Sequence, residues 1–259
     1  MIKKNVKYTN NYFETVNTLS PINVQFMFEK KDGQVKLRGN NDSGNCLFIL
    51  KAPKDNFDFA EDKDESTLCM LDYTKFYKFY KEFDNVDEKD NNNSEQAVLD
   101  VAVNENTDEP VLMDISSNKT KCNFKYCLAN TDVIKKPIIK ENPKMPEFVT
   151  SIKLSKDVVN LLMHRIGMVD ANFINFTLNG DICTFTGKNN VTMQEYSENI
   201  KLETPVDKTI NVIVKADAFK LLPTADYDVY FSEQHLIKYE QKRDDELDLT
   251  LFMTTVKEG

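Results

Sequence analysis

Asn23-Val-Gln-Phe-Met-Phe-Glu-Lys-Lys-Asp-Gly-Gln-Val-Lys-Leu-Arg38 alternates apolar and polar residues on both sides of the turn pair Asp32-Gly33, a pattern typical of a β-hairpin. A second stretch, Phe173-Ile-Asn-Phe-Thr-Leu-Asn-Gly-Asp-Ile-Cys-Thr-Phe185, has the same layout around Asn179-Gly180. A helix-patterned segment precedes each stretch. A repeat with a period of about 147 residues is too long for a solenoid, so it predicts two copies of one domain.

The length and composition are those of a globular protein. With 259 residues, of which 41% are apolar, the chain is long enough for two domains of about 130 residues. No apolar run is long enough to span a membrane, and the start Met1-Ile-Lys-Lys-Asn5 does not resemble a signal peptide. We therefore expect a cytoplasmic protein without a membrane partner.

The cysteines have scattered spacings, none of which is typical of zinc ligands. We expect no metal and no cofactor. All five are predicted to be small apolar side chains in a reducing compartment: Cys46, Cys69, Cys122, Cys127 and Cys183.

The net charge is −9, which taken alone argues against nucleic-acid binding, because phosphate contacts need cations. The distribution of charge matters more than its sum. The acidic residues gather in stretches with loop character: Asp55–Glu65, Asp84–Glu95, Asn104–Glu109 and Arg243–Glu246.

Helical periodicity predicts two helices in each copy. The first copy has Lys4–Leu19 and Tyr73–Phe83, and Asp72 is a good N-cap for the second of these. The second copy has a helix after the N-cap Ser155, which runs to Gly167, and a short one at Lys215–Leu222. Arg165 falls among the apolar positions of its helix and is left unassigned.

The helix Tyr73–Phe83 has two chemically different faces at about 100° per residue. Five aromatic residues form one side: Phe76, Tyr77, Phe79, Tyr80 and Phe83. Three lysines form the other: Lys75, Lys78 and Lys81. Considered by itself, the lysine side is an ordinary solvated face.

A proline-containing segment without a clear period separates the two copies. We therefore predict a first domain at 1–130, a connector at 131–148 and a second domain at 149–259. Each domain is mostly β with two helices, so the fold class is α+β. Beyond the two hairpins, the predicted strands are Cys46–Leu50, Thr67–Leu71, Val98–Val103, Val111–Ile115, Cys122–Leu128, Tyr196–Leu202, Ile210–Val214, Asp228–Ser232, Leu236–Glu240 and Leu247–Met253.

Several segments resemble a DNA sliding clamp, in particular the clamps of T-even-type bacteriophages. Phe219-Lys-Leu-Leu-Pro-Thr-Ala-Asp-Tyr-Asp-Val-Tyr-Phe231 resembles the last helix, turn and strand of those proteins, and Leu161-Leu-Met-His-Arg-Ile-Gly167 resembles their third helix. Asn17-Thr-Leu-Ser20, the helix that begins near Leu71 and the connector follow in the expected order. Proliferating cell nuclear antigen and its relatives share this two-domain plan.

The resemblance implies a head-to-tail homotrimer whose six domains form a ring around duplex DNA, with the helices lining the hole. It would contact the DNA backbone without reading bases. The positions assigned to this contact are Lys4, Lys7, Lys75, Lys78, Lys81, Lys156, His164, Lys215 and Lys220. Met163 and His164 stand where the phage relatives are more basic, so either the basic belt is thinner there or Arg165 compensates.

The resemblance also implies that the ring tethers a replicative DNA polymerase, takes other peptide-motif partners and is opened by an ATP-dependent clamp loader. In a phage these events take place inside the infected host cell. The residues assigned to a peptide groove are Ile134, Pro137, Ile138, Tyr227, Leu251, Phe252 and Met253, although the last three also fit the core. The strand edges expected at the subunit interface are Lys121–Leu128 and Tyr196–Leu202.

No motif in the sequence indicates an enzyme, because a P-loop, a dinucleotide-binding fingerprint and an HExxH pattern are all missing. The sequence contains only two histidines, His164 and His235, which argues against a histidine-centred catalytic site. Acidic pairs such as Asp244-Asp245 are expected to be solvated. Two alternatives stay open: a monomeric DNA-binding processivity factor of the same fold, and a nuclease that holds metal ions with scattered carboxylates.

Overall fold

The structure, a computed structural model, describes residues 2–83, 97–107, 109–117, 123–140, 143–234, 236–243 and 246–256. The chain divides into two compact units. The first comprises Met1–Gly39 and Leu50–Pro137, and the second comprises Asn40–Ile49 and Ile138–Gly259. The break between Pro137 and Ile138 lies inside the predicted connector, whose described residues form neither helix nor strand.

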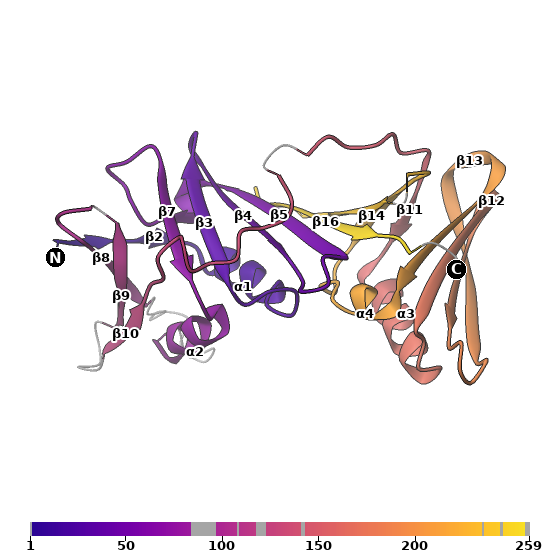
Figure 1. The fold of residues 1–259 in the computed structure, drawn as a ribbon, viewed down its shortest axis with the longest axis horizontal. Coiled ribbons are helices and arrows are strands. Elements are labelled where there is room, and N and C mark those ends of the chain that lie inside the picture. Colours follow the sequence, from indigo (N-terminus) through magenta and orange to yellow (C-terminus); the bar gives the residue numbers. More distant parts are fainter. Residues whose placement is uncertain are drawn as a thin grey trace, which may run out of the picture. The chain divides into compact units, whose positions relative to one another are not determined.

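The first unit has two helices, α1 (Asn10–Thr18) and α2 (Tyr73–Phe83), which lie on one side of its strands (Figure 1). One of its sheets has the strand order β1-β8-β9-β10, and β3 pairs with both β4 and β7. Strand β5 (Cys46–Pro53) contributes residues to both units. The other elements are β1 (Ile2–Asn5), β2 (Lys7–Tyr8), β3 (Phe26–Lys31), β4 (Gln34–Asn40), η1 (Lys54–Asn56), β6 (Phe57–Asp58), β7 (Ser66–Met70), β8 (Val98–Val103), β9 (Pro110–Ser116) and β10 (Asn123–Cys127).

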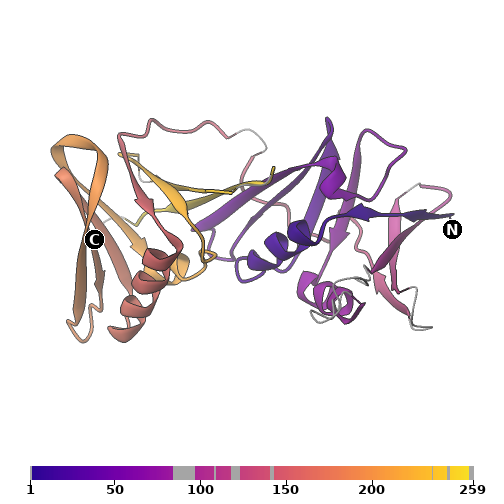
Figure 2. The same cartoon turned by 180° about the vertical axis from the view of Figure 1, so that it is seen from behind.

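The second unit has α3 (Lys156–Met168), which runs beside β12 (Phe173–Lys188), and the short α4 (Ala216–Phe219), as Figure 2 shows from behind. Its sheet has the order β11-β14-β15-β16. Val159, Leu162 and Ile166 bury one face of α3, whereas Leu161 on the same helix is 39% exposed. The remaining strands are β11 (Thr150–Leu154), β13 (Glu195–Lys215), β14 (Tyr227–Ser232), β15 (Leu236–Gln241) and β16 (Asp248–Thr254).

The first predicted hairpin is confirmed and the second is wrong. Asp32 and Gly33 both have positive φ, 53° and 72°, as a two-residue type I′ turn requires. At Asn179-Gly180 only the glycine has positive φ, 58°, and the register of pairing with β13 shifts there. Strand β12 therefore continues through a bulge at Asn179-Gly180, and the chain turns only after Lys188.

The two-copy layout is visible in the strand pair ahead of the second helix of each unit. In the first unit, Phe26–Lys30 pairs with Ser66–Met70, and α2 follows. In the second, Phe173–Leu178 pairs with Ile210–Lys215, and α4 follows. The duplication seen in the sequence thus corresponds to this pair of strands, whereas the apparent return strand after Gly180 belongs to one long hairpin.

The predicted first helix begins too early. Residues Ile2–Asn5 form β1, in which Lys4 lies opposite Val101 of β8. The helix starts only at Asn10, because the Thr9 hydroxyl accepts a hydrogen bond from the Tyr12 N–H and caps it. Lys4 and Lys7 are consequently on strands and not on a helix face.

Asp72 is the N-cap of α2, as the sequence predicted. Its carboxylate accepts hydrogen bonds from the Thr74 hydroxyl at 2.6 Å and from the Lys75 N–H at 3.1 Å. The Thr74 hydrogen bond, followed by that of Lys75 and the Lys75 charge, lowers the pKa of Asp72 from its usual value. A lowered folded-state pKa means that this stabilisation is present above the unfolded pKa and is lost as pH falls through the folded one.

Replacing Asp72 with alanine is expected to lower the free energy of unfolding by about 1 kcal/mol at neutral pH, because it removes the cap. The difference between the two proteins should shrink below about pH 4, where the carboxylate of the natural residue becomes protonated. Urea denaturation at the two pH values measures both effects. Asp72→Asn, which keeps an acceptor, is the control. If the difference in free energy of unfolding between the natural protein and Asp72→Ala stayed the same at both pH values, the capping role would be contradicted.

No helix in the described part of the chain is long and apolar enough to cross a membrane.

Candidate nucleic-acid interface and partner groove

The two faces of α2 are separated as the sequence predicted. Phe76, Tyr80 and Phe83 are buried, whereas Lys75 and Lys78 are exposed. Phe79 is partly exposed, and its ring stacks on Phe124 of β10 at a centroid distance of 4.6 Å. The aromatic face fixes the rotation of the helix, so the lysines on the opposite face point to solvent.

The three lysines of α2 differ in how strongly the protein holds them. The Lys81 ammonium lies 3.2 Å from the Glu14 carboxylate and 5.7 Å from the ring of Tyr80. Lys75 lies over the Phe79 ring at 5.9 Å, and the structure gives the Lys78 ammonium no partner among the residues it describes. Lys75 and Lys78 are therefore the cations of α2 most available to a phosphate.

Lys4 and Lys7 are paired with the acidic loop that follows β6. The Lys4 ammonium contacts both oxygens of Asp62, at 2.8 and 2.9 Å, and lowers the pKa of that carboxyl. Lys7 bonds Glu61 at 2.6 Å, which raises the pKa of Lys7. Both lysines are on strands and already have carboxylate partners, so their assignment to a helix face is wrong. Their contact with DNA stays a prediction.

The second unit offers fewer cations on its helices. Lys156 is the first residue of α3, where its N–H donates to Asp226, and His164 is exposed two turns further on. Lys215 and Lys220 are exposed as well, but they are the residues that flank α4 on either side. The short α4 thus carries no lysine of its own, and the expectation of a thinner basic belt in this half stays a prediction.

Arg165, which the sequence left unassigned, packs against β13 with 36% of its side chain exposed. Its guanidinium lies 4.9 Å from the centre of the Tyr196 ring and donates to the Tyr196 hydroxyl and the Glu198 carboxylate. The Tyr196 hydrogen bond, with Glu198, raises the pKa of Arg165. Its place among apolar positions in the helical projection was the signal that it faces the body of the unit.

The buried side of β16 corrects part of the predicted peptide groove. Leu251 and Met253 have no exposed surface, and Tyr227 is 1% exposed with its hydroxyl donating to the Pro223 carbonyl at 2.7 Å. These three residues belong to the core of the second unit. A strand alternates its faces, so Phe252 points to the opposite side from Leu251 and Met253.

Phe252 packs beneath the connector, in a cluster with Leu47, Ile49 and Ile139. The neighbouring connector residue Ile138 is 64% exposed, and its N–H donates to the Asn40 side chain at 3.0 Å. In the first unit, Ile134 is buried and Pro137 is partly exposed. Of the residues predicted for the groove, Ile138 is thus the apolar side chain that a partner can reach directly.

Both strand edges predicted for the subunit interface are open in the single chain. Strand β10 ends the β1-β8-β9-β10 sheet, although Lys121 and Cys122 lie outside the described residues. Among the residues that the structure describes, the stretch Tyr196–Leu202 pairs with β12 alone. Each edge exposes backbone groups that another strand can pair with.

The titratable side chains that the structure describes do not gather into a metal site. Across the residues with a described position, no three His, Cys, Asp or Glu side chains come together for one. Burial raises the pKa of Cys46 and Cys183 to about 12 and that of Cys69 to about 11. Cys127 is exposed. The stretch 84–95, Asp244-Asp245 and His235 lie outside the described part.

No protein-family model and no curated protein matches this sequence. Solved structures match it over nearly its whole length. The Proliferating Cellular Nuclear Antigen of Entamoeba histolytica has a TM-score of 0.71 at 17% identity and covers 98% of both chains. The chain has the fold of the DNA sliding clamps.

Two further clamp structures agree. A. fulgidus PCNA bound to the C-terminal region of FEN-1 has a TM-score of 0.65 at 11% identity, over 100% of both chains. The PCNA2–PCNA3 complex of Sulfolobus tokodaii has a TM-score of 0.68 at 12% identity, over 98% of this chain and 99% of that chain. The clamp fold therefore accounts for both units, but at this identity it carries no residue role across.

Proposed function

We propose that this protein is a sliding clamp that encircles duplex DNA and holds a replicative polymerase on its template. The observation that carries the proposal is the two-sided helix α2, whose aromatic face is buried and whose Lys75 and Lys78 are exposed, in a chain with the clamp fold. DNA carries about one charge per 1.7 Å of its length, so exposed lysines attract it without reading bases.

Lysine suits a contact that must slide. Its ammonium is a point charge on a flexible stem, so it can move from one phosphate to the next without fixing a register. The net charge of −9 means that surfaces away from these lysines repel DNA. Individual contacts are then weak and salt-sensitive, and encirclement, not tight binding, keeps the protein on DNA.

Encirclement requires a closed assembly, which we propose is a homotrimer with six domains. The support is the clamp fold together with the open edges of β10 and of Tyr196–Leu202, since strand pairing between subunits in a head-to-tail order closes a ring. Light scattering after size-exclusion chromatography is expected to give three times the subunit mass of 29.9 kDa. A monomer that still stimulates a polymerase would favour the non-encircling alternative instead.

The tether to the polymerase is proposed to be a short peptide that docks beside the connector. The A. fulgidus clamp is bound to a C-terminal region of its partner, which supports the same mode here. The exposed Ile138 beside the cluster of Phe252, Leu47, Ile49 and Ile139 would be the contact that the peptide covers first. Partners of this kind are expected to include a polymerase and an ATP-dependent clamp loader.

Ile138→Ala is expected to weaken binding of such a partner peptide by about tenfold, because burying an isoleucine in an interface contributes roughly 1.5–3 kcal/mol. Fluorescence anisotropy with the C-terminal peptide of the cognate polymerase measures the change. Val133→Ala is the matched control, since Val133 is 61% exposed in the same connector but lies in the first unit. Equal losses for the two variants would place the groove elsewhere.

The nearer relationship to T-even-type phage clamps is also a proposal. It rests on the sequence resemblance of residues 161–167 and 219–231. In that case the protein acts in the cytoplasm of an infected bacterial cell. Stimulation of a phage polymerase, but not of a cellular one, in primer extension on a long template is the expected result.

A further inference from the structure

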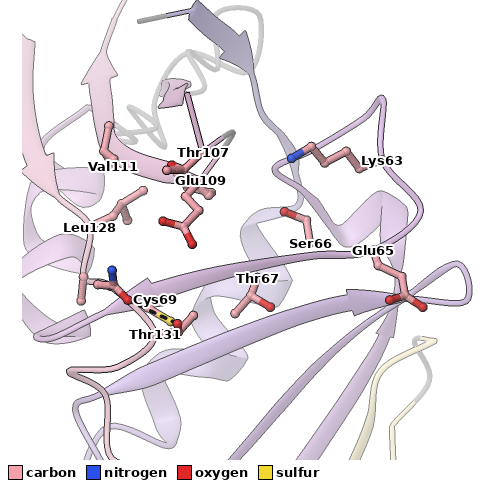
Figure 3. A pocket seen from close by; sticks show the side chains of 13 residues that line it. Lys63, Glu65, Ser66, Thr67, Cys69, Thr107, Glu109, Val111, Leu128 and Thr131 are labelled. Atoms are coloured by element: carbon pink, nitrogen blue, oxygen red, sulfur yellow. Dashed lines mark hydrogen bonds between the residues drawn. The ribbon is translucent and has the colours of Figure 1, made fainter. Parts of the chain in front are cut away.

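A wedge-shaped cavity opens in the first unit where the chain crosses from one sheet to the next. The Leu128 N–H donates to the Val111 carbonyl of β9 at 3.1 Å, and the Ala129 N–H donates to the Cys69 carbonyl of β7 at 2.9 Å. Beyond this crossing, the edge of β7 and the start of β9 diverge. They enclose a cavity of about 460 Å³, whose lining side chains are drawn in Figure 3.

The edge of β7 that faces this cavity has unpaired backbone groups. The Cys69 carbonyl points outward to Ala129, and outward-pointing groups recur at every second residue of a strand. The N–H and carbonyl of Thr67 therefore point to the same side, into the cavity. In the described part of the chain, the outer edge of β7 makes one isolated bridge, Cys69 with Ala129, so Thr67 is left open to pairing.

The side chains around the cavity are suited to a polar chain with a basic residue. Hydroxyl groups come from Ser66, Thr67, Thr107 and Thr131. Figure 3 shows the Glu109 carboxylate directed into the open space, and the structure gives it no partner among the described residues. On the far side Glu65 is already paired, with Lys31 at 3.1 Å. Glu109 is thus an exposed anion with no ion pair among the described residues, although Lys63 also lines the cavity.

A second hollow of about 340 Å³ begins at the same Thr67 and Thr131. It extends beside Met27 and Glu29 of β3 to Pro137. The space is therefore longer than one side-chain pocket. It allows a bound chain to continue past the open edge of β7.

We propose that this wedge binds an extended peptide of a partner protein, which adds a strand antiparallel to β7 opposite Thr67 and places a lysine or arginine against Glu109. Backbone hydrogen bonds to an open edge give affinity in this mode, and a side-chain pocket gives selectivity. The unpaired edge favours a peptide over a compact small molecule, and the carboxylate disfavours nucleic acid. The site lies wholly in the first unit and does not require ring formation.

The test uses the full chain and a labelled, capped peptide of alternating valine and lysine. The reference is the same peptide with every backbone amide N-methylated, which keeps its charge and side chains but removes the N–H donors from both of its edges. Binding by fluorescence anisotropy is expected to be about tenfold weaker for the N-methylated peptide. Glu109→Gln is expected to weaken binding of the first peptide by about tenfold as well, since it removes a charge-assisted hydrogen bond.

Asp157→Asn is the control for net charge, because Asp157 is an exposed carboxylate on α3 and should leave affinity within about twofold. Hydrogen exchange is expected to show protection of the Thr67 amide on peptide binding. Equal losses for Glu109→Gln and Asp157→Asn would overturn the proposal. So would equal affinity for the two peptides, protection confined to other amides, or no binding at millimolar peptide.

Discussion

The double replacement Lys75→Glu with Lys78→Glu is expected to lower the affinity for duplex DNA by about a hundredfold at 0.1 M salt. Each lysine–phosphate contact contributes a slope of about −0.9 to the dependence of log affinity on log salt, so each is worth nearly tenfold at that salt concentration. Both side chains are exposed on a face that the packing of α2 does not use, so the fold should remain intact. Electrophoretic mobility or anisotropy at several salt concentrations measures the loss and the reduced slope.

The matched control is Lys140→Glu with Lys144→Glu. It makes the same change in net charge on exposed connector residues, far in sequence from any helix. Affinity for DNA should then fall by a few fold at most, through the long-range field alone. If the connector variant loses as much as the α2 variant, the lysines of α2 are not the contact surface.

Phe13→Ala is expected to lower the free energy of unfolding by about 3–5 kcal/mol, the usual range for truncating a buried phenylalanine. Phe13 is fully buried, and its ring lies 5.1 Å from those of Tyr8, Phe57 and Tyr80 and 5.4 Å from that of Phe76. It joins α1 to α2 and to the strands beneath them. Urea denaturation followed by circular dichroism measures the change.

Val191→Ala is the control for that experiment, since Val191 is 86% exposed and should change stability by less than about 0.5 kcal/mol. A loss below about 1 kcal/mol for Phe13→Ala would mean that the site collapses without cost. In that case the aromatic cluster would not be what fixes the rotation of α2.

Features decided by local chemistry could be predicted from the sequence. Asp72 and Ser155 cap their helices as expected, because an N-cap depends on a side chain and an N–H only a few residues away. The aromatic and lysine faces of α2 are separated for the same reason, since helical periodicity acts over neighbouring turns. The strand Val98–Val103 was likewise correct to the residue.

Features that depend on pairing between strands far apart in the sequence could not be predicted from the sequence. Residues Ile2–Asn5 fit a helical projection, but pairing with β8 makes them a strand. Asn179-Gly180 has the composition of a turn, yet pairing of β12 with β13 on both sides of it leaves room only for a bulge. The strand β11 was missed altogether, because its short pattern has meaning only beside β14.

The candidate site also contains residues that local sequence predicted and residues that it did not. Exposure of Lys75 and Lys78 follows from the helix itself, but the ion pairs of Lys4 and Lys7 depend on where the loop at 61–62 folds back. Leu251 and Met253 were assigned to a groove by resemblance, although alternation on β16 places them in the core. The open edge at Thr67 gave no sequence signal, since an unpaired edge is a property of two strands and not of one.

Retention on DNA whose ends are blocked tests encirclement most directly. A duplex fixed to a bead at one end is exposed to the protein, and its free end is then capped with a bulky protein before a wash at high salt. We predict that the protein stays on the capped duplex, is lost from the uncapped one, and is released when a restriction enzyme cuts the capped duplex. Equal loss from capped and uncapped DNA, or retention that survives the cut, would contradict a ring around the duplex.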